Sequence, residues 1–138
     1  MELAGAKRCF QFLKDAGLKI TAFISDRHLG IAKWIRESEK KTVHYNDLWH
    51  VSKGLMKRIL NAGKEQGNEI ILVWQKAIKK HLYWSAGSTT QGFGDLIVVK
   101  WKSLIRHIAD NHHDHSDPLY EKCAHGELEP RDWIYVGK

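Results

Sequence analysis

The chain has 138 residues, of which 43% are hydrophobic, and it contains six tryptophans but only two prolines. This composition is typical of a folded globular protein and excludes a disordered chain, and the length favours one folded unit. The net charge of +6 is unevenly divided, because residues 1–109 carry nineteen Lys and Arg against nine Asp and Glu, whereas residues 110–132 carry two against seven.

That division fits a basic body that binds a polyanion, followed by an acidic, His-rich end with another role. Solvated lysine-rich helix faces would give the same composition. The two cysteines, Cys9 and Cys123, lie far apart and form no disulfide framework, which favours a reducing compartment. No apolar run reaches the roughly 18 residues of a membrane span, and no signal peptide is evident. We therefore expect an intracellular protein that does not enter a membrane.

The first half of the chain alternates helical and strand patterns. Apolar residues at helical spacing predict a helix that ends near Gly17, and residues 19–25 are typical of a largely buried strand. A second amphipathic helix is expected over residues 27–38, and residues 42–45 form a short strand candidate. The next helix begins at Asn46 or Asp47, continues to about residue 63, and completes a pattern that favours a parallel α/β arrangement.

The second half contains no convincing strand. Two helical patterns cover residues 70–81 and 93–108, and the segment between them is rich in Gly, Ser and Thr. Residues 111–118 have no periodicity and predict a loop, and the remainder of the chain is irregular.

Asp26 directly follows the first predicted strand. Open α/β sheets place their ligand sites at the carboxyl ends of strands, and a carboxylate there can coordinate a hard cation such as Mg²⁺. The simpler alternative is that Asp26 only caps the helix that starts at Arg27.

Residues 24–28 read ISDRH, and residues 44–53 read HYNDLWHVSK. Together with the gap of about twenty residues between them, they resemble a strand-Asp-helix-strand-Trp-His block of DDE-type transposases with an RNase H-like fold, of which the Mutator-like group is the nearest. Residues 80–85 (KHLYWS), 101–104 (WKSL) and 122–126 (KCAHG) are also similar to uncharacterised transposon-derived proteins of animal genomes. The resemblance thus extends over most of the chain.

The resemblance implies that Asp26 is the second metal-binding carboxylate of a catalytic set that uses Mg²⁺ or Mn²⁺. It extends more loosely to the family motif residues Asp47, Trp49 and His50, and it implies DNA as the partner and the nucleus as the location. The first carboxylate of such a set belongs on an earlier strand, and none is predicted before residue 20. We therefore expect an interior fragment of a transposase, inactive alone, whose missing core strands an oligomer or a partner would supply.

The last carboxylate of the family has no clear counterpart here. Glu121, Glu127 and Glu129 qualify by their order along the chain, and no motif supports any of them.

A second group of candidate ligands lies in the last segment. Imidazole and thiolate favour zinc, and a structural zinc site draws four ligands, for which we select His112, His115, Cys123 and His125. The alternative is a solvated His-rich loop. Mg²⁺ or Mn²⁺ is not expected at this group, because its ligands are nitrogen and sulfur.

A third group consists of cations on the predicted helices. The residues selected for contact with the DNA backbone are Lys53, Lys57, Arg58, Lys76, Lys79 and Lys80. Together they could neutralise several phosphates and would make binding strongly dependent on salt. Trp49, Trp74 and Trp101 are assigned to the core rather than to base stacking, because each lies on or beside an apolar stripe.

These observations predict a helix-rich α/β fold. Residues 1–66 would form a partial RNase H-like core of two short parallel strands with helices, residues 67–110 an all-α insertion, and residues 111–138 an irregular His/Cys tail. The favoured function is a DNA-binding fragment of a transposase catalytic domain. The alternative is a small domesticated module, binding DNA or protein, in which zinc stabilises the tail.

Overall fold

The computed structural model describes residues 1–90 and 92–135. Although the length of the chain favours one folded unit, the chain divides into two compact units, residues 1–55 and residues 56–138. The physical reason is that the short parallel sheet closes a small core of its own with the two helices that directly precede its strands, residues 2–15 and 29–38.

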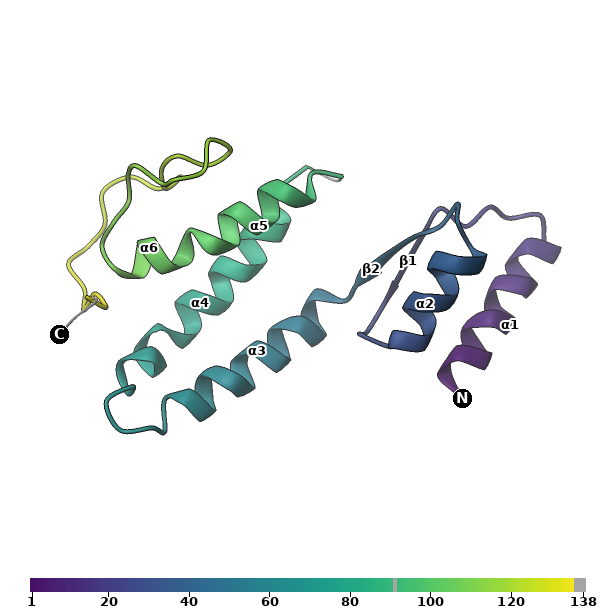
Figure 1. Ribbon diagram of the computed structural model, residues 1–138, viewed down its shortest axis with the longest axis horizontal. Coiled ribbons are helices and arrows are strands. Elements are labelled where there is room, and N and C mark those ends of the chain that lie inside the picture. Colours follow the sequence, from purple (N-terminus) through teal and green to yellow (C-terminus); the bar gives the residue numbers. More distant parts are fainter. Residues whose placement is uncertain (91, 136–138) are drawn as a thin grey trace. The chain divides into compact units, whose positions relative to one another are not determined.

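The N-terminal unit alternates helix and strand as the sequence predicts. It contains α1 (Glu2–Asp15), β1 (Ala22–Ser25), α2 (Leu29–Ser38) and β2 (Val43–Asn46), and it ends within α3 (Leu48–Ala62). Figure 1 shows α2 beside the two strands and α1 next to α2. The strands are parallel, with Ala22 opposite Val43 and Ser25 opposite Asn46, so the expected parallel strand-helix-strand unit is confirmed.

Aliphatic and aromatic side chains form the core of this unit. Phe10, Ile31 and Ile35 are buried. The ring of Phe10 meets Phe23 edge-on at 5.2 Å between centroids and Trp34 at 4.9 Å. Such edge-to-face pairs contribute roughly 0.5–1.5 kcal/mol each beyond the burial of their area. They attach α1 and α2 to one face of the sheet.

The other face of the sheet is uncovered within this unit. Ile24 is 67% exposed and Val43 is 53% exposed. The prediction of a largely buried strand is therefore wrong for β1, where exposed and half-buried residues alternate. The continuous apolar run in the sequence favours a strand covered on both faces, whereas only the face toward α1 and α2 is covered here.

The C-terminal unit is helical and then irregular. It contains α4 (Ile70–Gly87), α5 (Gly94–Lys102) and α6 (Leu104–Ile108), with α5 packed on α4. The single helix predicted over residues 93–108 is thus two helices, separated at Ser103. Residues 111–135 contain no helix or strand, in agreement with the loop predicted over residues 111–118, and residues 136–138 of the predicted tail lie outside the described residues. Among the described residues, no helix has both the length and the apolar character needed to cross a membrane.

A buried lysine fixes α5 against the end of α4. The Lys100 ammonium donates to the Ser88 carbonyl at 3.0 Å, to the Ser88 hydroxyl at 2.9 Å and to the Thr89 hydroxyl at 3.1 Å. It also lies 5.0 Å from the centroid of the Trp84 ring. Because three acceptors and an aromatic face replace water around the charge, Lys100 can be buried in this helix pair.

Candidate metal centre

Four side chains of the C-terminal unit bring their ligand atoms together. His107 comes from α6, His112 from the loop that follows it, and Cys123 and His125 from the tail. These ligand atoms all lie within 4.8 Å of one another. The His107 Nδ1 atom lies 3.6 Å from the Cys123 sulfur and 3.2 Å from His125 Nε2. This group can hold a metal ion.

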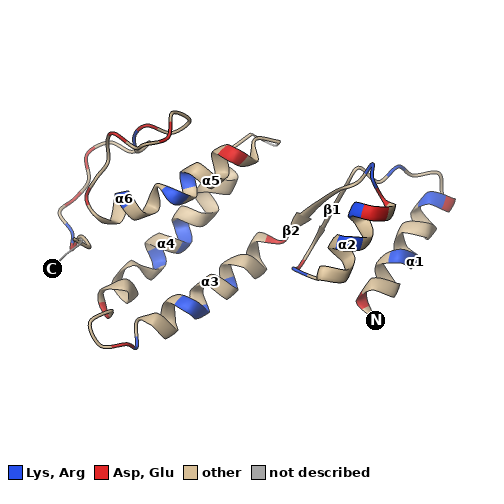
Figure 2. Ribbon diagram, viewed as in Figure 1, with Lys and Arg blue, Asp and Glu red and all other residues tan. Residues whose placement is uncertain are grey.

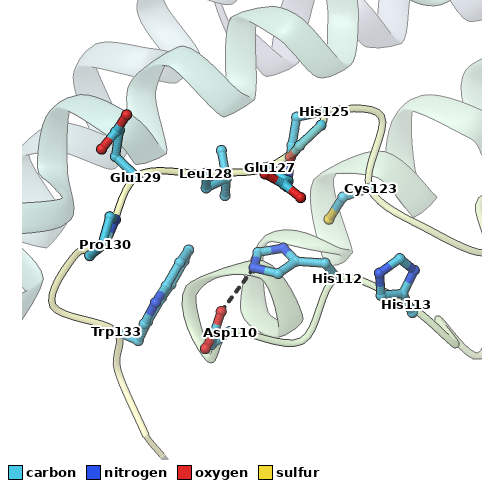
Figure 3. A pocket seen from close by; sticks show the side chains of 11 residues that line it. Asp110, His112, His113, Cys123, His125, Glu127, Leu128, Glu129, Pro130 and Trp133 are labelled. Carbon is cyan, nitrogen blue, oxygen red and sulfur yellow. Dashed lines mark hydrogen bonds and ion pairs between the residues drawn. The ribbon is translucent and has the colours of Figure 1, made fainter.

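Hydrogen bonds from outside the group hold the outer nitrogens of two of its histidines. The Nε2 atom of His112 is 3.1 Å from a carboxylate oxygen of Asp110, a contact drawn as a dashed line in Figure 3. Its Nδ1 atom is buried and has no hydrogen-bond partner among the described residues. The Nδ1 atom of His125 contacts the Gly126 carbonyl at 2.8 Å, so Nε2 faces His107. Such outer contacts fix the tautomer and orientation of histidines that ligate a metal.

Burial sets the protonation states of two members of the group. Desolvation, followed by the electrostatic influence of the neighbouring His112 and His125, lowers the pKa of His107 to about 4. His107 is therefore a neutral imidazole at pH 7, the form that binds a metal. Burial also raises the pKa of the Cys123 thiol, so a metal ion must displace that proton.

Tertiary contacts hold the tail in place around the group. The Cys123 amide donates to the His112 carbonyl at 2.9 Å. Farther along, the Arg131 guanidinium lies 3.9 Å from the centroid of the buried Trp74 ring on α4, whose indole N–H donates to the Asp132 carbonyl at 2.9 Å. The tail is thus bonded to its own first loop at Cys123 and fastened to α4 beyond its ligands.

A cavity of about 450 Å³ lies beside the group, and Figure 3 shows its lining. His112, Cys123 and His125 form part of its wall, together with Trp133. The cavity provides a route by which an ion could enter.

Three of the four zinc ligands expected from the sequence belong to the ligand group found in the structure. His112, Cys123 and His125 belong to it, whereas His115 does not. His115 is buried, and its Nε2 atom lies 3.8 Å from the Cys123 sulfur, next to the group rather than in it. The fourth member, His107, was missed because it lies in a helical pattern assigned to packing. Its spacing of five residues from His112 is the signal that would have included it.

Asp26 lies where the sequence places it, directly after β1, and its side chain is exposed. The reading of Asp26 as a helix cap is wrong. The N-cap of α2 is His28, whose Nδ1 atom accepts the amide proton of Ile31 at 3.2 Å. Within residues 1–90 and 92–135, the His/Cys group is the one cluster of three or more candidate ligands, and it does not include Asp26, so no ligand cluster supports Mg²⁺ or Mn²⁺ binding at this residue.

The family motif residues occupy the start of α3. A carboxylate oxygen of Asp47 accepts the Trp49 amide at 2.8 Å, and the other oxygen lies 3.0 Å from His50 Nδ1. The hydrogen bonds from Trp49 and His50 lower the pKa of Asp47. Asp47 thus caps α3, as the sequence predicts. Trp49 is 52% exposed, so its assignment to the core is wrong, whereas Trp74 is fully buried as predicted.

The six cations selected for DNA contact all have exposed side chains: Lys53, Lys57, Arg58, Lys76, Lys79 and Lys80. In the described part of the chain, none of them forms an ion pair with a carboxylate. Lys53 lies 4.8 Å from the centroid of the Trp49 ring. Figure 2 shows Lys and Arg residues on α3 and also on α4.

Fold and site together define a helix-rich α/β chain with a His/Cys group able to hold a metal ion. Comparison with protein-family models, with curated proteins and with solved structures finds no match for this chain.

Proposed function

We propose that residues 56–135 form a zinc-stabilised module that binds the phosphate backbone of DNA. The observation that carries the zinc proposal is the convergence of one thiol and three imidazoles on a single point. Zinc accepts this mixed nitrogen and sulfur set, and four protein ligands leave no open position for a water or a substrate. The role of the ion is therefore structural.

Two of the distances within the group match those of tetrahedral zinc. Bonds of about 2.05 Å to nitrogen and about 2.3 Å to sulfur give tetrahedron edges of roughly 3.3 Å between two nitrogens and roughly 3.6 Å between nitrogen and sulfur. The corresponding distances are 3.2 Å between His125 and His107 and 3.6 Å between Cys123 and His107. The buried and unpartnered Nδ1 atom of His112 needs a partner of this kind.

Metal analysis of the two single-cysteine variants tests this role. The unmodified chain should contain one equivalent of zinc, and Cys123→Ala should contain none. Cys9→Ala is the matched control, because Cys9 is exposed and lies in the N-terminal unit. Chelation should also make residues 111–135 sensitive to protease. Absence of zinc from the unmodified chain, or its retention by Cys123→Ala, would reject the zinc proposal.

The DNA half of the proposal is supported by the unpaired cations. Lys76, Lys79 and Lys80 recur at helical spacing on α4, and Lys57 and Arg58 are exposed on α3. Lysines of this kind contact phosphates without reading bases, so binding should weaken steeply with salt and differ little between sequences. A titration with a short duplex at two salt concentrations tests this expectation. An affinity that does not change with salt would refute it.

A second candidate function concerns the N-terminal unit. We propose that this unit descends from the RNase H-like core of a DDE transposase, a nuclear enzyme, and that Asp26 is a surviving ligand for Mg²⁺ or Mn²⁺. The observation that favours it is the exposed carboxylate at the carboxyl end of β1 in a parallel strand-helix-strand unit. With one carboxylate, binding should be weak and strand transfer absent.

Paramagnetic broadening by Mn²⁺ tests the Asp26 proposal. The NMR signals around Asp26 should broaden in the unmodified chain, and Asp26→Asn should lose the effect. Asp15→Asn is the control, because Asp15 is an exposed carboxylate at the end of α1. Equal broadening in the Asp26→Asn variant would leave Asp26 without a metal-binding role.

A further inference from the structure

A second cavity, of about 230 Å³, lies between the helical stretch formed by α5 and α6 and the loop at residues 115–120. The residues of its wall that matter here are Lys102, Arg106, His115, Ser116, Asp117 and Tyr120. All of them belong to the C-terminal unit. Neither the zinc proposal nor the cations on α3 and α4 account for this cavity.

Two positive charges line the cavity without a carboxylate partner. Among the described ion pairs, none involves Lys102 or Arg106. The Arg106 guanidinium has one long contact, 3.4 Å to the Asp114 carbonyl, which leaves most of its donors unused. Like charges four residues apart in a helical stretch repel each other, and an anion between them removes that cost.

The one carboxylate of the wall does not neutralise this pair. An Asp117 oxygen accepts the Leu119 amide at 3.0 Å, which holds the carboxylate in the turn of its own loop. Even if Asp117 is counted in full, two cations face one anion. The lining therefore has a net positive charge.

Neutral donors complete the lining. The Ser116 hydroxyl has no hydrogen-bond partner in the described part of the chain, and its side chain is exposed at the cavity. The Tyr120 hydroxyl accepts the Ala124 amide at 3.0 Å, which leaves its own proton to donate. Guanidinium, ammonium and hydroxyl donors around one small cavity match a tetrahedral oxyanion.

One residue of the wall, His115, contacts a member of the ligand group. His115 is 8% exposed, lines the cavity, and has its Nε2 atom 3.8 Å from the sulfur of Cys123. A zinc ion with one thiolate and three neutral imidazoles carries a net charge of +1, which would add to the positive potential of the cavity.

We propose that this cavity holds one phosphate group of a nucleic-acid backbone. The choice of nucleic acid rests on the proposed DNA binding and on the excess of Lys and Arg over residues 1–109. Bound there, the phosphate is held by Lys102 and Arg106 and oriented by the Ser116 hydroxyl. The cavity thereby sets the position of the DNA backbone on the zinc-bound unit, whereas the cations of α3 and α4 contribute charge alone.

The first experiment titrates the zinc-loaded full chain with inorganic phosphate and follows backbone amide signals by NMR. Saturable shifts centred on Ser116 and Arg106 are expected in the unmodified chain. They should be absent from the double variant Lys102→Gln/Arg106→Gln. The charge-matched control is Lys33→Gln/Lys40→Gln, two exposed lysines of the N-terminal unit, and it should retain the shifts.

The second experiment titrates the same proteins with a short DNA duplex between about 50 and 200 mM salt. Loss of one phosphate contact should lower the slope of log K against log salt by about one and weaken binding about tenfold at the lower salt concentration. If the cavity variant keeps the slope and affinity of the control, the cavity proposal is overturned while DNA binding stands. If phosphate saturates at the cavity but the unmodified chain binds no DNA, the cavity is a site for free phosphate and the proposed DNA binding fails.

Ser116→Glu provides a test that retains both cations. A carboxylate at this exposed position should occupy the cavity and abolish the phosphate shifts, while the zinc content stays at one equivalent. If the double variant Lys102→Gln/Arg106→Gln does not fold, Ser116→Glu still tests whether the cavity binds phosphate. Phosphate binding that persists in Ser116→Glu would overturn the proposal.

Discussion

Replacement of His107 by Gln should separate a true metal centre from a His-rich loop. His107 is the only member of the ligand group that lies on a helix, and it contacts both Cys123 and His125. Structural zinc sites bind with about 10–16 kcal/mol at pH 7, so one of four ligands contributes roughly 2.5–4 kcal/mol. Because each 1.4 kcal/mol is a factor of ten, His107→Gln should raise the Kd for zinc about 10²–10³-fold.

The assay is competition with a chromophoric chelator, performed beside a matched control. His113→Gln removes an exposed histidine of the same loop that lines the neighbouring cavity but lies outside the ligand group. Its Kd for zinc should equal that of the unmodified chain. Cobalt substitution gives a second readout, since loss of one imidazole changes the tetrahedral spectrum. Equal zinc affinities for the two variants would refute the assignment of the four ligands.

Two further predictions concern proton release and packing. Zinc affinity should rise with pH, by up to about tenfold per unit near neutrality, because the Cys123 thiol, whose pKa is raised, must lose a proton to bind the ion. His107, with a pKa of about 4, is already neutral in this range. Chelator competition from pH 6.5 to 8 measures the slope, and an affinity that does not change with pH would contradict the prediction. Gly63→Ala should destabilise the chain by about 1–3 kcal/mol, because the added methyl would clash with the Leu72 side chain. Gly87→Ala, where a methyl meets nothing within 4 Å, is the control in urea unfolding. Equal unfolding midpoints for the two glycine variants would count against the packing described here.

The sequence predicted the order of the elements because each is encoded by local chemistry. The end of α1 near Gly17 follows from that glycine, whose φ of +77° suits a residue without a side chain. Asp47 supplies the carboxylate that caps α3. The exposure of Ile24, by contrast, depends on which elements cover each face of the sheet. That information is not contained in the composition of a single strand.

The candidate site was predicted in part, for a similar reason. His112, Cys123 and His125 stand out because they are reactive side chains in a segment without periodicity. His107 lies beside an apolar helical stripe, and its participation depends on how the tail returns past α6. That path is set by contacts distant in sequence, such as the 2.7 Å hydrogen bond from the Ile134 amide to the Ile108 carbonyl. The spacing of histidines and cysteines along the chain does not reveal that the tail passes back beside α6.

The composition of the tail explains why a metal ion would be needed there. Among residues 111–135, His115 alone is buried, and no helix or strand pairs the backbone of this segment. So little apolar burial cannot offset the roughly 1–2 kcal/mol of conformational entropy that each ordered residue loses. An ion shared by His107, His112, Cys123 and His125 supplies that free energy at one point. Chelation should therefore release the tail while α4 and α5, which pack on each other and are joined through the buried Lys100, remain folded.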